Sequence, residues 1–303
     1  MKIIHKLEQC FQNHSYCFSF EYYPPKNRDN WPDFYGKIKR MSRMEPAFID
    51  VTWGTGDPTS FASIEIANQI QCLTQIDTMM HLTCTHRSRD ELIHIVDDLI
   101  HKTPIRNLMA LRGNKPPHDD WKKHPNGFAC AAELVAALRS NFADTLGIAV
   151  AGYPEGHHED GKPPAPDFIR TSAYYKQIEH TRHKIDAGAD FIVTQLCFDM
   201  DQICRYRDDC FKAGIHVPIV PGLLPIHSHK AWQKIATFSA TIPQNLAEQY
   251  QLHQFDDDDA LACFAVSLLN QQIDRLHHEG FHAIHLYTLN HERLLSRWKA
   301  SRP

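Results

Sequence analysis

Polar and ionisable side chains interrupt several short apolar runs of this chain. Glu21 lies within YCFSFEYYPP, and His81 lies within TMMHLTC. A carboxylate costs several kcal/mol to bury unless it is paired or protonated. Burial also raises the pKa of a carboxylic acid, which makes Glu21 a candidate general acid. The alternative is a salt-bridged or rim-exposed glutamate, and the pattern alone does not choose between the two.

Two further positions have side chains suited to ligand binding. Arg112-Gly113 follows the run NLMAL, where a guanidinium can hold an anionic group and glycine permits close backbone approach. The alternative is an arginine with a structural role at a strand end. Gln195 within FIVTQL is expected to be a buried amide that needs partners, either a ligand ring edge or a neighbouring strand.

Three familiar motifs are incomplete in this sequence. Gly54-Thr55-Gly56 lacks the third glycine of a dinucleotide fingerprint, and residues 156–162 have P-loop spacing but are followed by Pro163. His227-Ser-His229 is spaced like a metal-binding pair, but no carboxylate or third-ligand motif accompanies it. We therefore expect no metal site.

Eight short, nearly continuous apolar runs must position these side chains. Such runs are typical of strands buried on both faces of a parallel sheet. They span residues 16–22, 47–53, 78–84, 106–112, 147–153, 190–196, 217–223 and 281–288. Amphipathic stretches lie between them, with helices expected at 90–102, 131–142, 178–187 and 257–279.

Strands that alternate with helices predict an α/β fold, a (β/α)₈ TIM barrel, more than an open doubly wound sheet. No linker or shift in composition divides residues 1–303, so we expect a single domain. Functional side chains of such barrels gather where the strands end. Excess chain at 154–167 and between the last two strands predicts insertions.

Composition excludes several classes of protein. The 303 residues include 32 Lys+Arg and 36 Asp+Glu, a net charge of −4, which argues against nucleic-acid and polybasic membrane binders. No apolar run approaches the roughly 20 residues of a membrane helix, and no signal peptide is visible. The nine cysteines form no C-x-x-C pair and predict buried free thiols in the cytoplasm.

Eight motifs, in order along the chain, resemble the catalytic barrel of methylenetetrahydrofolate reductases, particularly short eukaryotic-like forms. They are FSFEYYPPK, FIDVTWGTGDP, HLTC, NLMALRGN, AVAGYPEGH, AGADFIVTQLCFD, PIVPGLLPI and HLYTLN. The resemblance implies a barrel that binds FAD and uses NADH or NADPH to reduce methylenetetrahydrofolate to methyltetrahydrofolate. It covers nearly the whole chain, from about residue 18 to residue 290.

The resemblance also assigns roles to individual residues. Glu21 would be the general acid that opens the five-membered folate ring, and Gln195 would contact both nicotinamide and folate. His291 would lie in the folate site. The flavin-contacting positions would be Thr52, Trp53, His81, Arg112, Gly113, Asn114, Ala131, Tyr153, His157 and Lys184. His157 and Lys184 would lie near the phosphate and ribose portion.

The chain departs from the family pattern at four places. Asn114 replaces the catalytic aspartate of LRGD, which predicts a higher flavin potential and weaker folate turnover. His291 replaces the arginine of TLNR and carries less charge at neutral pH. Cys130 replaces a tyrosine, and Gln177 and His180 replace an acidic residue and an asparagine.

These departures leave alternatives open. The chain could transfer hydride to folate without flavin, use another acceptor, or be a non-enzymatic paralogue that keeps the barrel. A metal-dependent barrel hydrolase is a more remote alternative. The sequence ends soon after the eighth unit, so we expect no regulatory domain and no inhibition by S-adenosylmethionine. It does not choose NADH over NADPH, and it leaves open whether the chain forms a homo-oligomer.

Overall fold

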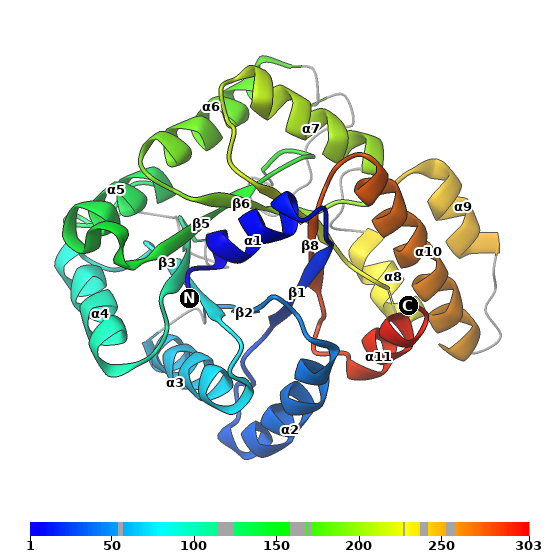
Figure 1. The fold of residues 1–303 in the computed structure, drawn as a ribbon, viewed down its shortest axis with the longest axis horizontal. Coiled ribbons are helices and arrows are strands. Elements are labelled where there is room, and N and C mark those ends of the chain that lie inside the picture. Colours follow the sequence, from blue (N-terminus) through cyan, green and yellow to red (C-terminus); the bar gives the residue numbers. More distant parts are fainter. Residues whose placement is uncertain are drawn as a thin grey trace.

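A computed structural model describes residues 1–53, 57–113, 124–157, 168, 171–226, 228–236, 242–252 and 258–302. Eight parallel strands in this part of the chain close into a barrel in sequential order, β1 to β8 (Figure 1). They are β1 Cys17–Tyr22, β2 Phe48–Val51, β3 Thr78–Thr83, β4 Asn107–Leu111, β5 Gly147–Gly152, β6 Phe191–Leu196, β7 Ile219–Leu223 and β8 Ala283–Tyr287. Each strand lies within one of the eight predicted runs, so the predicted (β/α)₈ barrel is confirmed.

Helix α1 Ile3–Gln12 precedes β1 and lies across one end of the barrel, whereas the later helices follow the strands and surround the barrel (Figure 1). The later helices are α2 Trp31–Met41, α3 Asp57–Thr74, α4 Arg89–Lys102, α5 Ala131–Phe142, α6 Ser172–Asp186, α7 Met200–Lys212, α8 His229–Ala236, α9 Gln244–Leu252, α10 Asp258–His278 and α11 Glu292–Ala300. The four predicted helices correspond to α4, α5, α6 and α10. The predicted excess before the last strand forms α8 and α9 in addition to α10. Among the described helices, none combines the length and hydropathy needed to span a bilayer.

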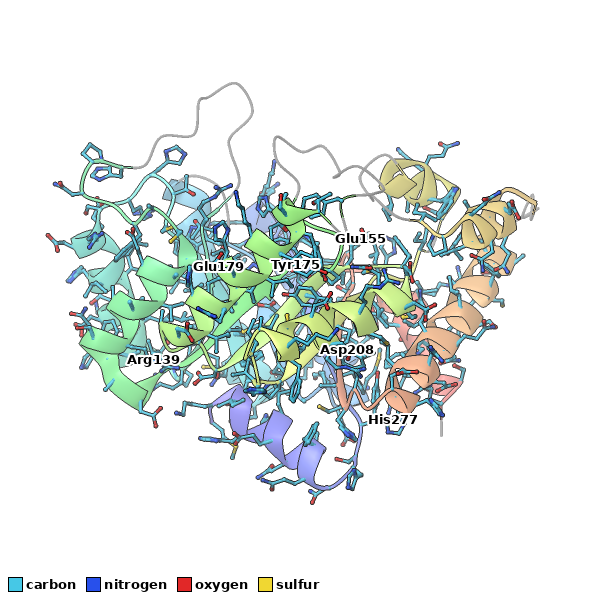
Figure 2. All side chains as sticks on the ribbon, turned by 90° about the horizontal axis from the view of Figure 1, so that it is seen from above. Arg139, Glu155, Tyr175, Glu179, Asp208 and His277 are labelled. Carbon is cyan, nitrogen blue, oxygen red and sulfur yellow. The ribbon has the colours of Figure 1, made fainter. Side chains whose placement is uncertain are left out.

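The barrel interior is apolar toward the amino ends of the strands. Phe48, Met79, Met109, Phe191 and Val220 fill it as one cluster. Helix α1 crosses this end, and its residues Ile3, Ile4 and Leu7 belong to the same cluster (Figures 1 and 2). This end of the barrel is therefore closed by apolar packing, which leaves the carboxyl ends of the strands as the open end.

The opposite half of the interior is polar. Glu21 pairs in register with Asp50 on β2 and with Tyr287 on β8, and Ser19 pairs with His285. Because side chains alternate along a strand, Ser19 and Glu21 share one face of β1. The strand register thus brings polar residues from separate apolar runs together, above the apolar cluster that fills the amino end of the barrel.

A separate apolar cluster lies beneath the insertion between β7 and β8. Trp232 of α8 stacks on Tyr250 of α9, with ring centroids 4.0 Å apart, and Leu261 of α10 packs with them. The insertion is therefore anchored by its own core. All nine cysteines are free, but only Cys84, Cys197 and Cys210 are buried, so the expectation of uniformly buried thiols was wrong.

Candidate active site

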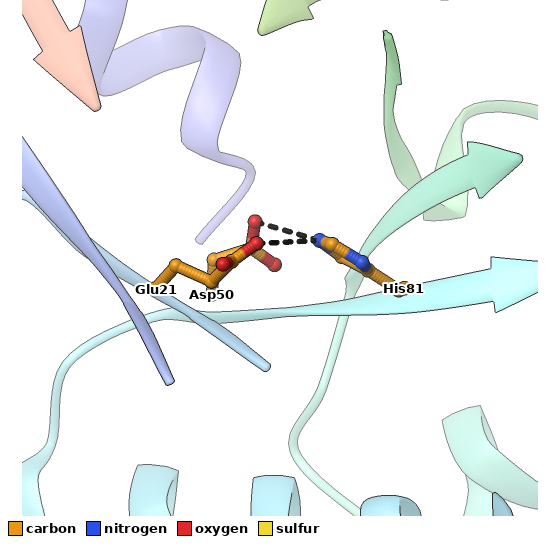
Figure 3. Close-up of side chains that lie close together, drawn as sticks. All are labelled: Glu21, Asp50 and His81. Atoms are coloured by element: carbon orange, nitrogen blue, oxygen red, sulfur yellow. Dashed lines mark hydrogen bonds and ion pairs between the residues drawn. The ribbon is translucent and has the colours of Figure 1, made fainter. Parts of the chain in front are cut away.

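Three ionisable side chains meet where β1, β2 and β3 lie side by side. His81 Nε2 lies 2.9 Å from Asp50 Oδ2, a hydrogen-bond distance, and 3.9 Å from Glu21 Oε2 (Figure 3). The side chains of Glu21 and Asp50 are 4% and 1% exposed, whereas that of His81 is 12% exposed. We call Glu21, Asp50 and His81 the acid cluster.

Burial dominates the electrostatics of the acid cluster. It raises the pKa of Glu21 from 4.5 to about 7, with a further increase from the Asp50 charge. His81 and a hydrogen bond from Tyr23 act in the opposite direction. For His81, burial alone would lower the pKa, but Asp50 and Glu21 together raise it. A substantial fraction of Glu21 is therefore protonated near neutral pH, and the two neighbouring carboxyl groups favour the protonated form of His81.

A second histidine lies behind the acid cluster. His285 is fully buried; its Nδ1 lies 2.8 Å from Ser19 Oγ, and its Nε2 lies 3.8 Å from Asp50 Oδ2. Burial lowers the pKa of His285 to about 4, so this imidazole is neutral at neutral pH. Sequence reasoning missed Asp50 and His285. The signal that singled out Glu21, an ionisable residue inside an apolar run, is present at both positions.

The acid cluster also has the spacing of a ligand set. In the described part of the chain, Glu21, Asp50 and His81 each offer one donor atom, all within 4.8 Å of one another. The 2.9 Å contact between His81 and Asp50 is that of a hydrogen bond, whereas Glu21 Oε1 and Asp50 Oδ1 are buried without a hydrogen-bond partner among the described residues. His227 and the side chain of His229, the metal-like pair of the sequence, lie outside the described residues.

A cavity of about 820 Å³ opens between the ends of β4 and β5 and helices α5 and α6. Five residues expected to bind flavin line it, namely Arg112, Ala131, Tyr153, His157 and Lys184. Lys176, His180 and His183 of α6 line it as well, and none of its described lining residues carries a carboxylate. The cavity is therefore suited to an anionic ligand.

Lys184 is the cation held most firmly in the wall of this cavity. Its Nζ donates to the Ala151 carbonyl over 2.6 Å and lies 5.6 Å from the centre of the Tyr153 ring. Burial lowers the pKa of Lys184 to about 8. Tyr153 packs edge-on against His157, whose backbone N–H donates to Gln177 Oε1 over 2.7 Å. Neighbours in the wall therefore fix the orientation of these side chains.

The other expected flavin contacts lie along the rim between the two sites. Thr52 and Trp53 are half-buried after β2, next to the acid cluster rather than in the cavity wall. Gly113 has φ +93°, and a Cβ there would lie 2.2 Å from Thr85 Oγ1, so only glycine fits. Asn114 lies outside the described residues.

Of the two expected folate contacts, Gln195 differs from its prediction. Gln195 is exposed and not buried; its Oε1 accepts from the backbone N–H of Leu196 over 3.0 Å. The prediction of a buried amide was wrong because Gln195 lies at the end of β6, beyond the packed interior. His291 is the N-cap residue of α11, exposed, and desolvation and Lys37 lower its pKa.

Comparison of sequences identifies relatives along the whole chain. The sequence model of methylenetetrahydrofolate reductase matches residues 6–298. The chain is 36% identical over 299 residues to methylenetetrahydrofolate reductase (NADH) 1 of Arabidopsis thaliana, covering 96% of this chain and 49% of that protein. It is 33% identical over 280 residues to 5,10-methylenetetrahydrofolate reductase of Pectobacterium carotovorum, covering 91% and 86%. The chain thus spans about half the length of the plant relative and most of the bacterial one.

Solved structures share the barrel at low identity. A Clostridium thermocellum protein described as binding two copies of 5-methyl-5,6,7,8-tetrahydrofolic acid superposes with a TM-score of 0.62 at 14% identity, covering 98% of this chain and 100% of that one. Oxaloacetate acetylhydrolase gives 0.54 at 8%, covering 99% and 84%. These likenesses show the fold alone. The match across residues 6–298 and the 86% coverage of the bacterial relative place the chain in the methylenetetrahydrofolate reductase family.

Proposed function

We propose that this chain reduces 5,10-methylenetetrahydrofolate to 5-methyltetrahydrofolate with NADH or NADPH, through bound FAD. The observation that carries the proposal is Glu21, a buried carboxylic acid whose pKa of about 7 keeps a substantial fraction of it protonated near neutral pH. Family membership supports the reaction class, and the names of relatives include both NADH and NADPH forms. The C. thermocellum barrel supports a folate as the kind of ligand that this architecture accepts.

The cavity beside β4 and β5 fits the anionic part of a flavin dinucleotide. Its volume of about 820 Å³ lies within the range of about 300–1,000 Å³ usual for ligand pockets. Arg112, His157 and Lys184 would face the phosphates, and Ala131 at the start of α5 leaves room for them. Gly113, Thr52, Trp53 and His81 would continue the site toward the acid cluster. Bound FAD would supply the hydride carrier between nucleotide and folate.

Glu21 supplies the proton that makes the folate reactive. Proton transfer from its carboxyl to the bridging nitrogen breaks the carbon–nitrogen bond of the five-membered ring and leaves an iminium carbon that accepts hydride. A carboxylate already ionised at neutral pH could not do this, so the burial of Glu21 is part of the chemistry. Gln195 would orient the nicotinamide and folate rings in turn, and His291 would contact the folate.

Asn114 distinguishes this chain from the family pattern. We propose that its neutral side chain, at the position of the aspartate in the family motif LRGD, raises the flavin potential and weakens stabilisation of the cationic folate. This departure keeps a flavin-free reductase as a second candidate function. An acid cluster at the open end of the barrel argues against a non-enzymatic paralogue, because a scaffold gains nothing from a buried proton donor.

Visible absorption of the purified protein during anaerobic addition of NADH or NADPH, and then folate, tests the proposal. We expect a flavin band that one nucleotide bleaches and that methylenetetrahydrofolate restores, with methyltetrahydrofolate as product. A colourless protein that still oxidises nucleotide with folate would favour the flavin-free reductase. A flavoprotein that folate never reoxidises would point to another acceptor.

A further inference from the structure

The proposed reaction uses one proton of Glu21 in every turnover. One O–H bond of its carboxyl breaks and one N–H bond forms on the folate, so Glu21 must regain a proton before it acts again. Its side chain is only 4% exposed, and the bound substrate would cover the open end of the barrel. A buried acid in this position needs a neighbour that delivers protons. The inference therefore depends on the proposed function.

Five ionisable side chains face Glu21 from the packed elements around it. Asp50 lies on β2, His81 on β3, His285 and Tyr287 on β8, and Tyr23 directly after β1. His285 is neutral, fully buried and separated from Glu21 by Asp50. Burial raises the pKa values of Tyr23 and Tyr287 well above the usual 10, so neither releases a proton at neutral pH.

Tyr23 is 42% exposed and hydrogen-bonded to Glu21, but its raised pKa means that it does not release its proton at neutral pH. His81 combines a proton that it can release with contact to both Glu21 and solvent. Its Nε2 lies 3.9 Å from Glu21 Oε2, and its side chain is three times as exposed as that of Glu21, 12% against 4%. A small rotation that turns the Nε2–H from Asp50 toward Glu21 would bring the two atoms within transfer distance. The 2.9 Å contact with Asp50 fixes the ring with Nε2 toward Glu21 and favours its protonated form.

We propose that His81 reprotonates Glu21 between turnovers and that Asp50 is the positioning residue that holds His81 for this transfer. The Nε2–H bond of the imidazolium breaks as the O–H bond of Glu21 forms. The neutral imidazole then takes a proton from solvent at the open end of the barrel. The hydride transfers of the proposed reaction are unchanged. Each turnover therefore consumes one proton from solvent.

Progress curves of His81→Gln and His81→Ala test the proposal in the flavin-loaded protein. Mixed at pH 6 with NADH and methylenetetrahydrofolate, the wild type should form product linearly. Both variants should form one equivalent per site and then slow about 10- to 100-fold, because Glu21 begins protonated and is reloaded slowly. Added imidazole should accelerate the slow phase of His81→Ala, but not the residual folate reduction of Glu21→Gln. His101→Ala, which removes an exposed histidine of α4, is the matched control.

Protonation of Glu21 can also be followed without catalysis. Infrared absorption of its carboxyl after a rapid pH jump, identified by its loss in Glu21→Gln, should relax at least about tenfold more slowly in His81→Gln than in wild type. Asp50→Asn should slow this relaxation as well and shift its pH midpoint, an effect that a purely structural role would not produce. This measurement needs neither folate nor flavin.

The two measurements separate the possible failures. Progress curves without a burst, no rescue by imidazole and unchanged relaxation in His81→Gln would overturn the role of His81. A wild type that never reduces folate, but whose infrared relaxation depends on His81, would overturn the proposed function and leave the proton transfer standing. If His81→Gln fails to fold, relaxation in Asp50→Asn decides, and an unchanged rate there would contradict the proposal.

Discussion

The acid cluster and the cavity beside it differ in the charge of their side chains and in their access to solvent. The acid cluster lies on β1 to β3, is nearly closed to solvent, and places two carboxyl groups around one imidazole. The cavity lies at β4, β5, α5 and α6, is open, and presents Arg112, Lys176 and Lys184 without a described carboxylate in its wall. One region is built to hold a proton, the other to hold an anion.

The comparison shows how one barrel separates binding from chemistry. Burial shifts the pKa of Glu21 upward and that of Lys184 downward, so both groups move toward neutral pH for the same physical reason. In the proposed reaction this shift makes Glu21 the proton donor. In the cavity it would make the affinity for the proposed anionic cofactor sensitive to pH.

The largest expected effect comes from removing the proton of the acid cluster. Glu21→Gln keeps the size of the side chain but has no acidic proton, so folate reduction should fall about 10²- to 10⁴-fold. Reduction of flavin by NADH or NADPH, measured anaerobically by stopped-flow absorbance, should retain most of its rate. Equal loss of both half-reactions would show that Glu21 acts mainly through structure.

Removing a positive charge from the cavity wall should weaken binding of the proposed FAD cofactor without changing proton transfer from Glu21. Lys184→Met should weaken FAD affinity about 10- to 100-fold, the usual contribution of a charged hydrogen bond. Because the pKa of Lys184 is about 8, affinity of the wild type should also fall as the pH rises through 8. Fluorescence titration at pH 7 and pH 9 measures both effects. Lys176→Met, which alters an exposed lysine of the same wall, should have a smaller effect.

The pH dependence of stability should reveal how much free energy of folding is lost when the buried Glu21 ionises. The pKa of Glu21 is higher in the folded state, so its ionisation opposes folding; this penalty is absent below about pH 4.5 and complete above about pH 7. Glu21→Gln should therefore raise Tm relative to wild type by about 2–6 °C more at pH 8 than at pH 4.5. Calorimetry at both pH values provides the measurement, and a pH-independent difference would contradict a raised pKa.

The smallest expected effect concerns His291, at the exposed end of the proposed folate site. His291 is largely neutral at pH 7 because desolvation and Lys37 lower its pKa. His291→Arg should restore a permanent charge and lower the KM for folate about two- to fivefold, the usual range for an exposed ion pair, with little change in kcat. Steady-state kinetics at pH 7 would detect this. A lower kcat at constant KM would place residue 291 near the reacting atoms.

The sequence predicted the frame of the molecule well. Eight apolar runs predicted eight strands, since residues buried on both faces of a parallel sheet must be continuously apolar. Helix α5 occupies 131–142 as expected, because its apolar stripe repeats at helical spacing. Glu21 was recognised because a carboxylate inside such a run needs an explanation.

Tertiary structure alone decided which side chains meet. Asp50 and His285 lie more than 200 residues apart in the chain, yet strand pairing around the closed barrel places them within 3.8 Å. Gln195, by contrast, lies in an equally apolar run but at its end, where packing stops and the side chain is exposed. Local sequence therefore determined which residues form each strand. The register of neighbouring strands and the depth of each residue within the barrel, which depend on contacts distant in sequence, determined the environment of each ionisable group.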